Sequence, residues 1–284
     1  MKSNVIVLFL LVVLVFAGCK GKQIQNNPND YIEVSVKMAN QISPEEEKLT
    51  QLLTRYPLPF NNEKGEANQI AERILQDKKS FLADLQEVLE KDTWDSLILA
   101  DKKHFLSEDY EPADLVSLTQ DLAKAHSYVI NRNDLSLRIP VEKALQTMAE
   151  AAKAEGITLV VSSTYRTYSY QKMIYERNVA QMGKEAADRE SAAPGTSQHQ
   201  LGVAIDFGSI TDEYAETKAG KWLASNASKY GFSLSFPKEY EAVTGYRREC
   251  WHYRYVGEKA IAFQEKWFND IQQYMIEFIY AWRQ

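Results

Sequence analysis

The chain has 284 residues and a formal net charge of −6, and hydrophobic residues make up 45% of it. This length and composition are sufficient for a real hydrophobic core and for more than one domain. Because acidic residues outnumber basic ones and no basic patch is visible, we expect no nucleic-acid partner. Nothing in the sequence predicts a protein partner.

The N-terminus has the features of a targeting signal. Lys2 precedes an apolar run of 13 residues, from position 5 to 17, which is shorter than the roughly 20 residues that span a membrane. The run ends in Ala17-Gly18-Cys19, which resembles a bacterial lipobox. We therefore expect residues 1–19 to be a lipoprotein signal peptide with Cys19 as the lipidation site. This predicts a cell-envelope protein, lipid-anchored to a bacterial membrane and facing the periplasm or the exterior. The alternatives are an ordinary signal peptide cut nearby and a short uncleaved anchor.

Residues 20–42 are polar, and we expect them to be a tether between the lipid and the folded part. A helix is predicted to begin after Ser43, because Ser43 is an N-cap candidate and Pro44 suits the first helical position. A second helix is predicted over 70–89, where apolar residues recur at helical spacing. These two helices predict a helical accessory region over 43–96, without visible chemistry.

The remainder, residues 97–284, is predicted to be a single α+β domain. Its longest helix, at the C-terminus, has an apolar stripe that we expect to pack against a sheet. The predicted helices lie at about 140–156, 169–183, 212–230 and 258–284, and the predicted strands at 157–162, 203–207, 232–236 and 251–256.

Three residues of this domain form a candidate metal site. His199 and Asp206 are seven residues apart, and Gly202 between them allows a tight turn into the strand that carries Asp206. With His252 as the third ligand, two neutral imidazoles and one carboxylate suit zinc and leave a fourth position open for water. The expected fold is therefore an α+β domain in which a small antiparallel sheet, flanked by helices, holds a single zinc ion.

Glu249 lies three residues before His252 and is a candidate base. In a regular strand these two side chains would point to opposite faces, so the chain must bend or bulge between them if both reach one site. Glu249 would then take a proton from the attacking water and pass it to the leaving amine. A single His or Asp is more often a structural hydrogen-bonding group, so the hypothesis depends on the whole set. His104 and His126 lie outside that set.

The segments around these residues are specific. They are Ser-Thr-Tyr-Arg-Thr at 163–167, the run at 194–206 that contains His199 and Asp206, Tyr-Gly-Phe at 230–232, Thr-Gly-Tyr at 244–246, and the run at 249–257 that begins Glu-Cys-Trp-His. In these motifs the sequence resembles the VanY-type D-alanyl-D-alanine carboxypeptidase family, which includes L,D-carboxypeptidases of the LdcB/DacB type. The resemblance covers roughly residues 97 to 260.

This resemblance implies a zinc metallopeptidase that hydrolyses the terminal D-alanine of peptidoglycan stem peptides. It makes His199, Asp206 and His252 the ligands of Zn²⁺ and Glu249 the catalytic base and acid. An L,D-carboxypeptidase acting on tetrapeptide stems, or an endopeptidase, would use the same ligands, because specificity lies in pocket contacts. The alternative from another class is a non-catalytic cell-wall-binding lipoprotein, which would have no need of Glu249.

The resemblance also implies substrate-binding residues. Arg166 matches the family's Tyr-Arg motif and is expected to bind substrate or stabilise the oxyanion, the structural alternative being a surface cation. Gln171 and Ser197 match positions near the substrate. Trp251 is expected to line the pocket, although an aromatic residue beside a strand ligand is as often part of the core.

Two positions depart from the family pattern. Cys250 stands where the family often has proline, and we expect it to pack rather than bind metal, because the ligand set is complete without it. If Cys19 carries lipid, Cys250 has no disulfide partner in the chain. Ser235 stands where an arginine or similar polar residue is common, which is expected to alter substrate contacts.

Overall fold

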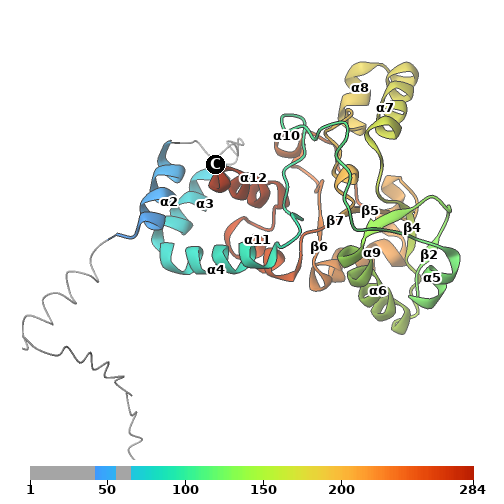
Figure 1. The fold of residues 1–284 in the computed structure, drawn as a ribbon, viewed down its shortest axis with the longest axis horizontal. Helices are drawn as coiled ribbons and strands as arrows, with labels where there is room; N and C mark the ends of the chain where they lie inside the picture. The colour runs from blue at the N-terminus through green and yellow to red at the C-terminus, as the bar shows by residue number, and fades with distance from the viewer. Residues whose placement is uncertain (1–41, 56–64) are drawn as a thin grey trace, which may run out of the picture. The chain divides into compact units, whose positions relative to one another are not determined.

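The computed structural model describes residues 42–55 and 65–284 of the chain. The predictions for the signal peptide, for Cys19 and for nearly all of the tether therefore lie outside the described residues. The described residues from Pro44 onward fall within one compact unit (Figure 1). Among the described helices, none has the length and apolar character needed to cross a membrane.

The N-terminal helices are α2 (Pro44–Arg55), α3 (Glu66–Gln76) and α4 (Lys78–Lys91). The helix predicted over 70–89 is therefore two helices. The break falls at Asp77, whose side chain accepts a hydrogen bond from the Ser80 backbone N–H and so caps the start of α4. Each helix buries an apolar stripe, as the spacing predicts.

The predicted C-terminal helix is also divided, into α11 (Glu258–Trp267) and α12 (Gln272–Arg283). Asn269 and Asp270, both at positive φ, turn the chain between them. The sequence predicts that this segment packs against the sheet. Instead, the buried apolar side chains of α11 and α12 form one hydrophobic cluster with those of α2–α4, separate from the core of the sheet. Figure 1 shows α11 and α12 beside α4 and α3. The Phe81 ring on α4 lies in this cluster, with ring centroids 5.1 to 6.2 Å from those of Phe263, Trp267, Phe268 and Phe278.

A five-stranded sheet in the order β2-β4-β5-β7-β6 forms the centre of the remainder. The sequence predicts an antiparallel sheet, but β2 and β4 pair in parallel, so the sheet is mixed. The reason is the long connection between these two strands, which contains a helix and returns the chain in the same direction. The strands are β2 (Val129–Ile130), β4 (Val160–Ser163), β5 (Ala204–Phe207), β6 (Phe232–Leu234) and β7 (His252–Tyr255), with β1 (Leu115–Ser117) and β3 (Ser136–Arg138) in a separate antiparallel pair.

Helices flank the sheet and bury their apolar stripes in its core. The predicted helix at 140–156 is α6 (Ile139–Ala154), in which Leu145 and Met148 are fully buried. The predicted helix at 212–230 is three shorter pieces, η2 (Asp212–Glu216), α9 (Lys218–Asn226) and η3 (Ala227–Tyr230). The other helices are α5 (Gln120–Ala125), α7 (Tyr168–Met182), α8 (Lys184–Glu190), η1 (Gln198–Leu201) and α10 (Glu241–Thr244).

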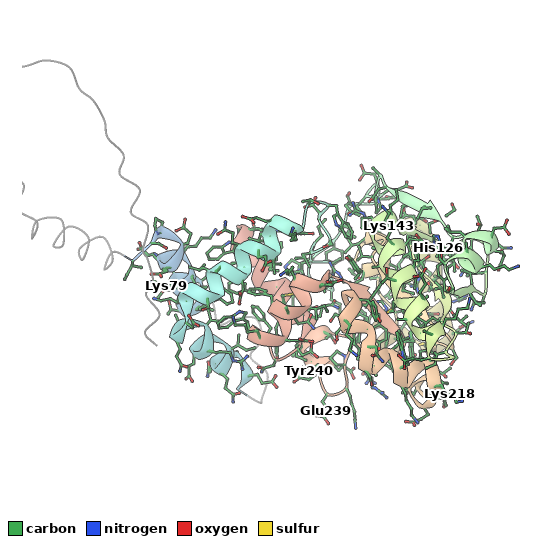
Figure 2. The ribbon with its side chains drawn as sticks, turned by 90° about the horizontal axis from the view of Figure 1, so that it is seen from below. Lys79, His126, Lys143, Lys218, Glu239 and Tyr240 are labelled. Carbon is green, nitrogen blue, oxygen red and sulfur yellow. The ribbon has the colours of Figure 1, made fainter. Side chains whose placement is uncertain are left out.

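The two histidines outside the candidate metal set have structural partners. His126, labelled in Figure 2, ends α5 and contacts Glu142 of α6, with 2.5 Å between Nδ1 and Oε1. His104 Nδ1 lies 2.8 Å from Asp101 Oδ1. Both imidazoles are therefore accounted for by local packing.

Candidate metal centre and active site

Local structure brings the three predicted ligands to one place. His199 lies in η1, and Gly202 directly after η1 has φ +69, which confirms the predicted turn into β5. Asp206 on β5 pairs with His252 on β7 in the antiparallel register. Side chains opposite each other on antiparallel strands project from the same face, so the aspartate and this histidine meet.

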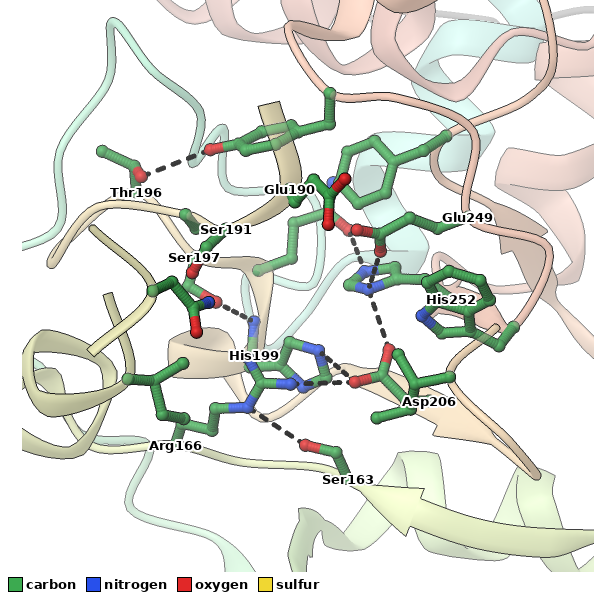
Figure 3. Close-up of a pocket in the computed structure, with 18 of the residues that line it drawn as sticks. Ser163, Arg166, Glu190, Ser191, Thr196, Ser197, His199, Asp206, Glu249 and His252 are labelled. Atoms are coloured by element: carbon green, nitrogen blue, oxygen red, sulfur yellow. Dashed lines mark hydrogen bonds and ion pairs between the residues drawn. The ribbon is translucent and has the colours of Figure 1, made fainter. Parts of the chain in front are cut away.

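The ligand atoms converge around the Asp206 carboxylate, as Figure 3 shows. His199 Nε2 lies 3.2 Å from Asp206 Oδ2, and His252 Nδ1 lies 3.1 Å from Asp206 Oδ1. One ligand atom from each residue lies within 4.8 Å of the others. All three residues are buried, with at most 4% of their surface exposed.

The surroundings of this set fit a cation. Asp206 Oδ1 is buried and, in the described part of the chain, accepts no well-aligned hydrogen bond. A buried carboxylate oxygen without a donor is costly, and a metal ion removes that cost. The outer nitrogens of the imidazoles have their own partners, because His199 Nδ1 lies 2.6 Å from Thr164 O and His252 Nε2 lies 3.2 Å from Gln198 Oε1. Zinc-binding histidines are held in this way.

The ionisation of the set also suits zinc. Burial, helped by the nearby Arg166 guanidinium, lowers the pKa of His199 to about 4, so this imidazole is neutral at pH 7. Burial by itself would raise the pKa of Asp206, but the imidazoles of His199 and His252 hold that pKa well below its ordinary value. A neutral imidazole and an ionised carboxylate are the forms that bind zinc.

The bend that the sequence requires between Glu249 and His252 is confirmed. The backbone N–H of His252 donates to the Glu249 carbonyl at 3.3 Å, and β7 begins only at His252. Glu249 Oε2 consequently lies 3.5 Å from His252 Nδ1, beside the three-residue set and outside it. Burial raises the pKa of Glu249 to about 7, and the neighbouring Asp206 charge contributes to the rise. A carboxyl that exchanges its proton near neutral pH is suited to general base and acid catalysis.

Arg166 is held by side chains on three sides. Its Nη2 donates to Asp206 Oδ2 at 2.8 Å, its Nε to Ser163 Oγ at 3.0 Å and its Nη1 to Gln171 Oε1 at 3.1 Å. Only 16% of the Arg166 side chain is exposed, so it is not a surface cation. Gln171 also donates to the Ala192 carbonyl at 2.7 Å, which fixes its own amide.

A cavity of about 380 Å³ opens onto this set. Among the substrate-binding residues predicted from sequence, Arg166, Ser197 and Trp251 line it, whereas Gln171 lies behind Arg166 and is not part of the lining. Cys250 is directed toward the Thr211 carbonyl, with its sulfur 3.6 Å from that oxygen, and is not part of the metal-binding set. Cys250 therefore packs, as expected.

Sequence reasoning missed the residues that hold Arg166 and the two histidines in place. Ser163 and Gln198 contact Arg166 and His252 respectively, and the Thr164 carbonyl contacts His199. The adjacency of Gln198 to His199 was the available signal, and it is weak because neighbouring residues in a turn project in different directions. Ser235, expected to alter substrate contacts, does not line the cavity and instead donates to Gln198 Oε1 at 2.7 Å.

The chain matches a family model and named sequences across this region. The family model for VanY, D-alanyl-D-alanine carboxypeptidase, matches residues 134–258. YodJ of Bacillus subtilis (strain 168), provisionally named a carboxypeptidase, is 39% identical over 170 residues, which is 58% of this chain and 61% of YodJ. The chain thus spans less than two thirds of that relative. A D-alanyl-D-alanine carboxypeptidase of Enterococcus faecalis (strain ATCC 700802 / V583) is 30% identical over 213 residues, or 72% of each chain.

Solved structures agree with the sequence matches. The LdcB LD-carboxypeptidase has a TM-score of 0.56 at 34% identity, covering 64% of this chain and 85% of LdcB. A mutant of the vancomycin-resistance D,D-pentapeptidase VanY, in complex with Zn(II), has a TM-score of 0.52 at 30% identity, covering 63% of this chain and 98% of VanY. On the strength of these matches, the chain belongs to the VanY family of D-alanyl-D-alanine carboxypeptidases.

Proposed function

We propose that this protein is a zinc-dependent D,D-carboxypeptidase that removes the terminal D-alanine from peptidoglycan stem peptides. The observation that carries the proposal is the convergence of His199, Asp206 and His252, with the Glu249 carboxyl beside them in a cavity. The solved structure of VanYB, which is in complex with D-alanine-D-alanine, supports a substrate that ends in D-alanyl-D-alanine.

The residues divide the hydrolysis between them. His199, Asp206 and His252 would hold zinc, and the chemistry that zinc supplies is polarisation of the scissile carbonyl and activation of water. Glu249 takes a proton from the attacking water while the water oxygen forms a bond to the carbonyl carbon. When the carbon–nitrogen bond breaks, Glu249 gives that proton to the amine of the departing D-alanine.

Arg166 is positioned to act on negative charge. Its guanidinium is held beside Asp206 by Ser163 and Gln171, so little rearrangement is needed for it to face a carboxylate or an oxyanion in the cavity. Gln171 thus contributes to substrate binding through Arg166. Ser197 and Trp251 complete the substrate contacts from the cavity wall.

An L,D-carboxypeptidase is the second candidate activity. The likeness to LdcB, an LD-carboxypeptidase, favours it. The two activities differ in the residue that precedes the terminal D-alanine, so a comparison of two substrates separates them.

The proposed location is the cell envelope, which is where a peptidoglycan-acting enzyme meets its substrate. We also propose that Cys19 carries a lipid and that residues 20–42 are a tether. Residues 43–96 would then be the helical accessory region, and residues 97–284 the zinc domain. The variant Cys19→Ala, produced in a bacterial host and fractionated, tests the anchor. A lipid-anchored protein should move out of the membrane fraction on this change, and an unchanged distribution would contradict the anchor.

The activity is tested with protein that lacks residues 1–19, supplied with zinc and incubated separately with muropeptide pentapeptide and tetrapeptide. Released D-alanine is followed by mass spectrometry. Release from the pentapeptide alone is the expected result, and release from the tetrapeptide alone would replace the D,D assignment with L,D. No release from either, with zinc bound, would contradict carboxypeptidase activity.

A further inference from the structure

The outer nitrogen of His252 faces a buried glutamine. His252 Nε2 lies 3.2 Å from Gln198 Oε1, and the two residues are 4% and 6% exposed. Gln198 is the residue before His199 and lies in the same short helix, η1. One turn of chain thus supplies one metal-binding histidine and contacts the other.

A chain of hydrogen bonds determines which way the Gln198 amide points. The Ser233 carbonyl is an obligate acceptor, and Gln272 Nε2 donates to it at 3.3 Å. The Gln272 oxygen must then face Gln198, and it accepts from Gln198 Nε2 at 3.4 Å. This leaves Gln198 Oε1 facing His252, where it also accepts the Ser235 hydroxyl at 2.7 Å.

This orientation selects one form of the His252 ring. An acceptor at Nε2 requires the ring proton to be on Nε2, so Nδ1 carries the lone pair and faces the Asp206 oxygen at 3.1 Å. His199 needs no such side chain, because the Thr164 backbone carbonyl performs the same task for its Nδ1. Of these two contacts, only the one made by the Gln198 side chain can be removed by a mutation, because the other is made by a backbone carbonyl.

We propose that Gln198 is a positioning residue for the metal, which holds His252 in the tautomer and orientation that bind zinc. Ser235 and Gln272 fix the Gln198 amide, and through Gln272 they connect helix α12 to the metal site. The inference rests on the proposed function in so far as His252 is a zinc ligand. It assigns a role in metal binding to the C-terminal helix, which is remote from the ligands in sequence.

The experiment measures zinc affinity rather than turnover. Metal-free Gln198→Leu and Gln198→Glu are titrated with zinc against a chelator of known affinity, and the visible spectrum of the cobalt-substituted proteins is recorded. Gln198→Leu removes the acceptor and should weaken zinc binding by about 10- to 100-fold. Gln198→Glu keeps an acceptor for His252 and should restore affinity to within about threefold of wild type, together with the wild-type cobalt spectrum.

Gln200→Leu is the matched control. Gln200 is also a buried glutamine of η1, but its amide donates to the carbonyls of Ser107 and Tyr110 instead of facing a ligand. This variant should lower the unfolding temperature and leave zinc affinity unchanged. A structural role for Gln198 would make the two leucine variants behave alike.

The proposal is overturned if folded Gln198→Leu binds zinc within twofold of wild type, or if Gln198→Glu is as weak as Gln198→Leu. If Gln198→Leu does not fold, Ser235→Ala decides, with several-fold weaker binding supporting the proposal and unchanged binding overturning it. Wild-type protein that binds no zinc would instead overturn the proposed function. Zinc-binding wild type that releases no D-alanine would contradict the activity and leave the positioning role intact.

Discussion

Replacing Glu249 by glutamine should strongly reduce turnover and at the same time stabilise the metal-free protein. Glutamine has the shape of glutamate but neither takes nor gives the proton that hydrolysis requires. We expect kcat to fall by about 10²- to 10⁴-fold. Zinc content should be unchanged, because Glu249 is not one of the three converging ligands.

The gain in stability follows from the pKa of Glu249. Burial raises it from its ordinary value of 4.5 to about 7, so the folded protein binds this proton more tightly than the unfolded chain does. The stability from this proton is fully present below pH 4.5 and is lost as the pH rises through 7. At about 1.4 kcal/mol per pH unit, the interval corresponds to about 3 kcal/mol. Metal-free Glu249→Gln should therefore be more stable than wild type at pH 8 by up to about 3 kcal/mol, and the difference should vanish near pH 4.5.

The assay is urea unfolding of the metal-free proteins at pH 4.5 and pH 8, alongside D-alanine release by the zinc-loaded proteins. Glu277→Gln is the matched control, because burial also raises the pKa of Glu277 to about 7 but this residue does not line the cavity. It should gain stability at pH 8 in the same way while keeping turnover. The reasoning is wrong if Glu249→Gln keeps turnover within tenfold of wild type, or if it gains no stability at pH 8.

Three further predictions concern the ligands, the arginine and the helical cluster. Asp206→Asn should lose most zinc affinity, because it removes the charge of the only carboxylate in the converging set. Stoichiometric zinc in this variant, measured by mass spectrometry, would contradict this. Arg166→Lys should lower kcat/KM by at least about tenfold, because a single ammonium does not reproduce contacts to Ser163, Gln171 and Asp206 together. A value of kcat/KM near that of wild type would argue against a role for the fixed guanidinium. Phe81→Ala should lower the free energy of unfolding, measured in urea, by about 3 to 5 kcal/mol, because the fully buried Phe81 ring packs on α11 and α12. A decrease below about 1 kcal/mol would mean that this cluster contributes little to stability.

The sequence alone was sufficient to identify the residues that the structure brings together at the candidate site. His199, Gly202 and Asp206 lie within one short segment, where a left-handed glycine turn and a strand leave few arrangements for the two ligands. Glu249 and His252 are close enough in sequence for simple strand geometry to require a bend, and the bend is present. Signals of this kind are local, so they can be read without knowing what packs against them.

Tertiary structure decided the partners of these elements. Helical periodicity predicts that 258–284 buries an apolar stripe but does not specify the surface that covers it, and that surface is α2–α4 rather than the sheet. The parallel pairing of β2 with β4 likewise depends on the path of the chain between them. Gln198, Ser235 and Gln272 are ordinary polar residues in sequence, and only the fold places them in one line of hydrogen bonds behind His252. Hydrogen-bond partners from distant segments leave no periodic trace in a sequence, because what defines them is distance in space.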